Sequence, residues 1–256
     1  MVNVVLISLI STAFWFGLDY LITPGSVKSW FRKYTFIRNS EGFYVHGVVH
    51  HVVVALGAFA VFRIETDPSV VGEPDRSFMC LPPVTPLSEI LPAISFGYGF
   101  HDVVDGFRRG LPSFVIHGLL LVFGFGFTLF LGVAHHMVRI LMINASSIFL
   151  NMRRLDGGSQ FNFAIDMMFV FSFVVLRIII LPLWWIQFLY RARNSNPDTW
   201  GDCMNKHIVM LSFLGGIILH GLNMFWFYLI VRNACRRYRT SSIKRKTVGV
   251  TSSSRT

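Results

Sequence analysis

The chain has 256 residues, of which 53% are hydrophobic and only 14% are charged, and its mean hydropathy is +0.56. This composition excludes an ordinary soluble domain, in which about a quarter of the residues are charged. The net charge of +10 would favour nucleic acid if the cations formed a patch on a soluble surface. They lie instead in short loops and a C-terminal tail, which is typical of membrane topology signals. We therefore expect an all-α protein, a polytopic transmembrane bundle of about seven helices, with no nucleic-acid partner.

Seven apolar segments approach the roughly 20 residues that a helix needs to cross a membrane. They are residues 2–22, 43–62, 88–104, 111–131, 133–150, 163–190 and 207–231. The first segment has no basic leader and no convincing cleavage site, so we interpret it as a retained helix. The fifth is short and contains His135, His136, Arg139 and Asn144, which indicates a tilted or partly buried helix.

The basic residues determine the expected orientation. With the C-terminal tail in the cytosol, most of the 23 lysines and arginines fall on the cytosolic side. This distribution follows the positive-inside rule and requires an odd number of spans, with a lumenal N-terminus. We divide the chain into a first helix and cytosolic loop (1–39), a helical bundle (40–237) and a basic, Ser/Thr-rich tail (238–256). The tail has nothing apolar to bury, so we expect it to be disordered.

The third predicted span contains a group of ionisable residues. His101, Asp102 and Asp105 fall within one helical turn, as H-D-x-x-D. A carboxylate that orients an imidazole suits general-base catalysis. In the alternative interpretation, Asp105 is solvated near the cytosolic end and Asp102 pairs with a basic residue.

Arg177 lies in the middle of the sixth predicted span. A guanidinium without partners is very costly there, so it requires a carboxylate or several carbonyl groups. Our hypothesis is that Asp102 is its partner. In a functional alternative, Arg177 binds the phosphate or carboxylate of a lipid head group.

Polar residues on two other spans indicate interior faces. His46 and His50 are one turn apart on the second span, and His220 and Asn223 are three residues apart on the last. A metal site would need further ligands beside such a histidine pair. Histidines that pack against polar neighbours are more common, so we expect no metal and no cofactor.

Two cysteines fall on the same side of the predicted membrane. Cys80 and Cys203 lie in loops on the lumenal side, where disulfides are permitted. A disulfide between them is a hypothesis.

Five short motifs then occur in a particular order. They are GYGFHD (97–102), SFVIH (113–117), NASSIFLNMRR (144–154), RIIILP (177–182) and NMFWFY (223–228). Together they make the chain, from about residue 40 to 237, resemble the TLC family of endoplasmic reticulum membrane proteins. That family includes ceramide synthases, translocon-associated membrane proteins and non-catalytic proteins of lipid homeostasis.

The resemblance is closer to the members that are not ceramide synthases. Family enzymes have two adjacent histidines where this chain has His117 and Gly118, and their H-D-x-x-D follows that pair rather than preceding it. The resemblance thus implies an endoplasmic reticulum protein of lipid homeostasis that binds an acyl chain or a sphingolipid inside its bundle. The alternative is an acyl-CoA-dependent N-acyltransferase in which His117, helped by Asp102 or His101, deprotonates the amine. A third interpretation is a trafficking or cargo adaptor with unidentified protein partners.

Overall fold

The computed structural model describes residues 3–22, 45–66, 85–132, 137–153, 159–194 and 206–252, and this part of the chain is helical and contains no strand. Its elements are α1 (Val4–Ile22), α3 (Val45–Glu65), α5 (Leu87–Arg108), α6 (Pro112–Phe130), α7 (Val138–Leu141), α8 (Asn144–Met152), α9 (Ser159–Phe173), the π-helix η3 (Val174–Ile180), α10 (Leu181–Asn194) and α11 (Lys206–Ser252). Helix is present at each of the seven predicted positions. The prediction of an all-α bundle of about seven helices is confirmed.

Several helices are suited to a membrane. Four stretches of the described residues are long and apolar enough to cross one: Val4–Leu21, His46–Glu65, Gln160–Tyr190 and Val209–Arg236. Helix α6 and the segment formed by α7 and α8 are apolar but shorter. Large apolar side chains such as Phe123, Phe171 and Ile186 are mostly exposed, as expected of a surface that faces lipid. The protein is an integral membrane protein.

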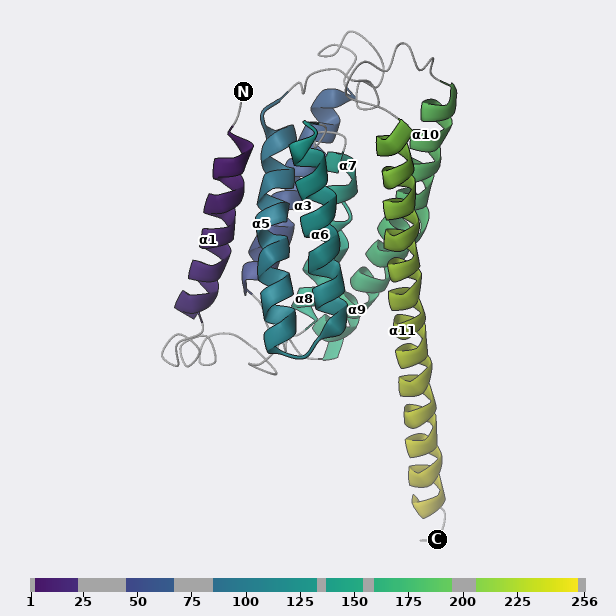
Figure 1. Cartoon of the computed structure of the whole chain (residues 1–256). Helices are drawn as coiled ribbons and strands as arrows, with labels where there is room; N and C mark the ends of the chain where they lie inside the picture. Colours follow the sequence, from purple (N-terminus) through teal and green to yellow (C-terminus); the bar gives the residue numbers. More distant parts are fainter. Residues whose placement is uncertain are drawn as a thin grey trace.

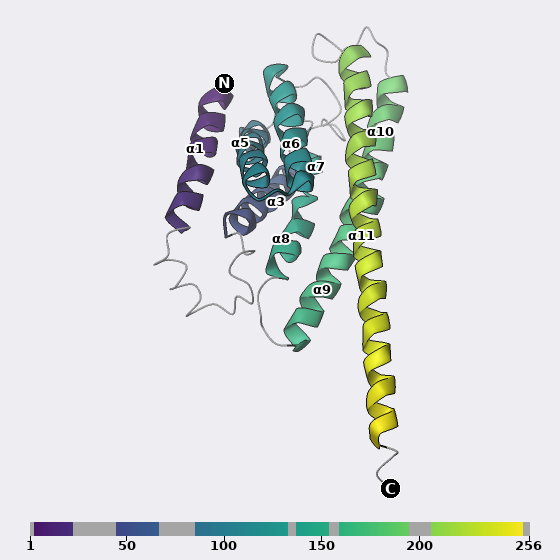
Figure 2. The ribbon, with the colours of Figure 1, turned by 60° about the horizontal axis from the view of Figure 1, so that its bottom comes forward.

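The helices run roughly along one direction, and the described ends of the chain lie at opposite ends of the bundle (Figure 1). Helix α5 packs most extensively against α6 and also against α1 and α3. On the other side of the molecule, α9, η3 and α10 form a continuous rod, of which η3 and α10 pack against α11 while α9 diverges from it (Figure 2). Helix α8 packs against both α3 and α9, so it connects the two halves.

Small residues allow α5 to approach its neighbours closely. A Cβ atom on Gly97 would lie 2.7 Å from the backbone nitrogen of Thr12 in α1. A Cβ atom on Gly99 would lie 2.8 Å from the Cβ of Leu121 in α6. Helices in membranes commonly associate through such small residues, which let their backbones meet. The two glycines of the GYG motif therefore allow α5 to contact α1 and α6.

The rod formed by α9, η3 and α10 contains an unusual segment. Seven residues, Val174–Ile180, form a π-helix with Arg177 at its centre, and Pro182 lies two residues after its end. Because proline has no backbone N–H, it cannot donate to the carbonyl four residues earlier, which disturbs the α-helical pattern. Such π-helical turns occur frequently at functional sites.

The last helix differs from the expectation for the C-terminal tail. Helix α11 continues to Ser252, whereas we expected disorder from residue 238. Residues 206–252 contain no proline, and their many lysines and arginines are good helix formers. Cys80 and Cys203, with the proposed disulfide, lie outside the described residues, and Cys235 is a free, exposed thiol.

Candidate functional site

A cavity of about 1200 Å³ lies within the bundle and is lined by residues of α3, α5, α6, α8, α9, η3 and α11. This volume exceeds the roughly 300–1,000 Å³ of common small-molecule pockets. The polar lining residues include Asp102, His117, Ser146, Ser147 and Arg177. The apolar lining residues include Phe163, Met167, Val170, Phe173, Leu229 and Ile230. The cavity is therefore large and amphipathic.

Arg177 is held in the cavity wall by three neutral oxygens. Its Nε donates to Ser146 Oγ at 2.7 Å, and its Nη2 donates to Ser147 Oγ at 2.7 Å. Its Nη1 donates to Asn223 Oδ1 at 3.2 Å. Two of these acceptors belong to α8 and one belongs to α11, so the guanidinium joins η3 to both helices.

The hypothesis that Asp102 neutralises Arg177 is wrong. Both residues line the cavity, but among the described residues Arg177 pairs with no carboxylate. Its guanidinium carbon also lies 5.4 Å from the centroid of the Phe173 ring and 5.8 Å from that of Trp226, within cation–π range. We expected a carboxylate or several carbonyl groups around this cation, whereas its acceptors are two serine hydroxyls and one amide carbonyl.

His117 and Asp102 face one another at the cavity. His117 Nε2 lies 3.9 Å from Asp102 Oδ2, and both side chains line the cavity wall. This separation is too long for a hydrogen bond but is close enough for a carboxylate to orient and stabilise an imidazolium. The His117 side chain is 20% exposed, so a bound molecule can reach it.

His101, the third predicted catalytic residue, lies elsewhere. It does not line the cavity, and its Nε2 lies 3.9 Å from Asp19 Oδ2 on α1. Successive residues of an α-helix point about 100° apart, which separates His101 from Asp102 although the two are adjacent in sequence. The structure therefore brings Asp102 and His117 together and places His101 in a different environment.

The histidines of α3 form a buried aromatic group around Tyr98. The ring of His50 stacks on that of Tyr98 with centroids 3.9 Å apart, and Trp15 meets both rings edge-on. His50 does not line the cavity, so its position indicates packing. His51 lines the cavity, and its Nδ1 lies 2.9 Å from Asn144 Oδ1.

That contact determines the His51 tautomer. The Asn144 amide nitrogen donates to the Leu141 carbonyl at 2.9 Å, which fixes the amide orientation. Its oxygen can then only accept, so the proton of His51 lies on Nδ1 and Nε2 carries the lone pair.

The remaining predicted polar residues occupy different positions. Asp105 lines the cavity and accepts a 2.7 Å hydrogen bond from Arg109, one turn further along α5. Asn223 is fully buried against Arg177. His220 is half-buried on the same helix and does not line the cavity.

Sequence reasoning missed two parts of these arrangements. Ser146 and Ser147 belong to the NASSIFLNMRR motif, but two adjacent serines gave no signal that they would bind Arg177. Asp19 lies within the first predicted span, and no partner was predicted for it. Its position within an apolar segment was a usable signal, because a carboxylate at membrane depth normally requires a partner inside the bundle.

The comparison with protein families covers most of these residues. The family model of the TLC domain matches residues 44–232, from the start of α3 into α11. No match was found among curated proteins. The matched region contains Tyr98, Asp102, His117, Arg177 and Asn223, and omits all of α1. The five motifs, the helical bundle and this match agree, and the chain belongs to the TLC domain family.

Proposed function

We propose that this protein binds one membrane lipid in its interior cavity and acts in lipid homeostasis. The observation that carries the proposal is the amphipathic cavity of about 1200 Å³, with a buried arginine at its polar wall. An acyl chain fits the apolar wall formed by residues such as Val170, Phe173 and Leu229. The head group then lies near Arg177. Lipids with an acyl chain and oxygen-rich head group, sphingolipids among them, are the proposed class.

Arg177 retains donors for such a head group. A guanidinium has five N–H donors, and the three hydrogen bonds to Ser146, Ser147 and Asn223 use three of them. Because no described carboxylate pairs with this cation, an oxygen with negative charge gains a strong, charge-assisted hydrogen bond. This chemistry favours a phosphate or carboxylate oxygen over a neutral one.

The cellular setting is part of the proposal. Family membership supports a membrane protein with a lipid-related role. We propose the endoplasmic reticulum as its location, with the N-terminus in the lumen and the basic C-terminus in the cytosol. The distribution of lysines and arginines along the sequence supports this orientation, and the resemblance to the TLC family supports the location.

Filling the cavity tests lipid binding. A Val170→Trp variant is expected to lose most of the lipid that co-purifies with the wild-type protein, because the indole occupies space proposed for the acyl chain. The measurement is mass spectrometry of lipid extracted from purified protein, expressed per protein chain. Leu183→Trp is the matched control, since Leu183 is 51% exposed on α10 and does not line the cavity. Equal lipid in the two variants and the wild type would reject the interior site.

The His117–Asp102 pair favours a second candidate function, acyl-CoA-dependent N-acylation. In this reaction the amine nitrogen of a long-chain base attacks the thioester carbonyl, the C–S bond breaks, and CoA leaves as its thiol. His117 would accept the proton of the amine and then give it to the departing CoA sulfur, and Asp102 would stabilise the intervening imidazolium. The basic loops would then meet the phosphates of CoA.

Release of free CoA tests this candidate. If the protein is an acyltransferase, the purified protein releases CoA when it is given a long-chain base and a long-chain acyl-CoA. His117→Ala and Asp102→Asn then reduce the rate by roughly 10²–10⁴-fold, which is the usual contribution of general-base catalysis. Glu89→Gln is the control, because Glu89 lies on the same helix as Asp102 and does not line the cavity. Absence of turnover in wild-type protein that retains lipid would reject the acyltransferase and leave lipid binding intact.

A further inference from the structure

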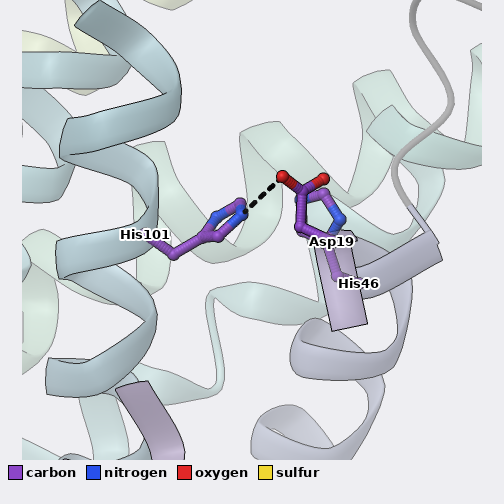
Figure 3. Close-up of side chains that lie close together, drawn as sticks. All are labelled: Asp19, His46 and His101. Atoms are coloured by element: carbon purple, nitrogen blue, oxygen red, sulfur yellow. Dashed lines mark ion pairs between the residues drawn. The ribbon is translucent and has the colours of Figure 1, made fainter. Parts of the chain in front are cut away.

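Three ionisable side chains from three different helices meet beside the cavity. They are Asp19 of α1, His46 of α3 and His101 of α5 (Figure 3). One ligand atom from each lies within 4.8 Å of the other two. The sequence separates these residues widely, so only the packing of α1 and α3 on α5 brings them together.

Both histidines are deeply buried. His46 is 4% exposed and His101 is 2% exposed, and their ring centroids are 4.5 Å apart at an interplanar angle of 64°. Neither nitrogen of His101 makes a hydrogen bond with a described residue: Nδ1 is buried without a partner, and Nε2 is 3.9 Å from Asp19. Buried polar atoms nearly always have a partner, so this imidazole indicates a missing ligand.

We propose that Asp19, His46 and His101 bind one Zn²⁺ ion. Two imidazoles and a carboxylate are a common ligand set for zinc, and a water molecule completes the tetrahedron. Metal–ligand bonds of about 2.1 Å place tetrahedral ligand atoms about 3.4 Å apart. The separations of up to 4.8 Å thus require small side-chain movements. Ca²⁺ and Mg²⁺ prefer oxygen ligands and fit the two histidines poorly.

The metal would fasten α1 to the rest of the bundle. Asp19 is the one proposed ligand outside the matched family region of residues 44–232, whereas His46 and His101 lie within it. The described contacts between α1 and α5 also include packing at Gly97, the edge-on contact of Trp15 with Tyr98, and the hydrogen bond from Ser11 Oγ to the Ile94 carbonyl. Because His46 also lines the cavity, the metal would fix one part of the cavity wall. This inference does not depend on the proposed lipid function.

Zinc titration of the full-length protein tests the inference. The protein is purified through a tag without histidine, stripped with a chelator, and titrated with Zn²⁺ against a chromophoric competitor. We expect the wild-type protein to bind one equivalent of Zn²⁺ tightly. Asp19→Asn and His101→Ala should weaken it by at least about 100-fold, since even second-shell losses cost about 10–100-fold. Zinc should raise the unfolding temperature of the wild-type protein and not that of Asp19→Asn.

Matched variants separate metal binding from misfolding. His220→Ala and Glu89→Gln, which remove a histidine and an acid outside the cluster, should bind zinc as the wild type does. His101→Cys should retain the tight equivalent, because a thiolate is also a zinc ligand. Absence of a tight equivalent in the wild-type protein would overturn the proposal. So would wild-type affinity in both His101→Ala and Asp19→Asn.

Discussion

Replacing Arg177 with leucine is expected to lower the unfolding temperature of the purified protein sharply and to remove its co-purifying lipid. The substitution takes the donors away from Ser146, Ser147 and Asn223, which are all well buried. Each buried polar group left without a partner costs about 1–3 kcal/mol. The effect should therefore exceed that of an ordinary substitution, which is about 1 kcal/mol.

Arg177→Lys separates the two roles of this residue. Lysine keeps the charge but presents one ammonium group instead of a planar fork, so it cannot reproduce all three hydrogen bonds. We expect a folded variant of intermediate stability that retains less lipid than the wild type. The measurements are thermal unfolding followed by tryptophan fluorescence and lipid content by mass spectrometry. If Arg177→Leu has the stability and the lipid content of the wild type, the hydrogen bonds of Arg177 support neither folding nor lipid binding.

Gly118→Ala is expected to destabilise the protein, whereas Gly124→Ala on the same helix should stabilise it slightly. A Cβ atom on Gly118 would lie 2.7 Å from both the Gly99 carbonyl oxygen and the Val103 backbone nitrogen. These are backbone atoms of α5, so the helices must separate, and overpacking of this kind costs about 1–3 kcal/mol. At Gly124 nothing lies within 4 Å, and alanine gains up to about 1 kcal/mol of helix propensity.

The pair of alanine variants makes this prediction easy to test. Both substitutions are the same chemical change on α6, so the difference between their unfolding temperatures isolates the contact with α5. Thermal unfolding in detergent, followed by tryptophan fluorescence, measures the difference. Equal unfolding temperatures would mean that the close approach of α5 and α6 does not limit stability.

Sequence patterns predicted the helices better than their contacts. Runs of apolar residues predicted helix at all seven positions, because length and hydropathy depend on the membrane and not on neighbouring helices. The partners of Arg177 depend on how α8 and α11 are rotated about their axes, and also on the π-helix that carries the arginine. No pattern within one span contains that information. A carboxylate partner was therefore expected where the structure has two serines and an asparagine.

The H-D-x-x-D motif illustrates the same limit. Its residues are close in sequence, and their types predicted polar contacts within the bundle. The helix nevertheless directs Asp102 to His117 in the cavity and His101 to Asp19 and His46 on another side. Asp19 lies more than eighty residues before Asp102, in a helix outside the family region, so its proximity follows only from tertiary packing.

The central claim is that the bundle interior holds one lipid molecule, and native mass spectrometry tests it most directly. The wild-type protein is released from nanodiscs of defined lipid composition, and the mass of the intact complex is measured as collisional activation increases. We predict one lipid that remains bound after the peripheral lipids have left, and its absence in Val170→Trp. A graded loss of all lipid, with no retained molecule in the wild type, would contradict the account.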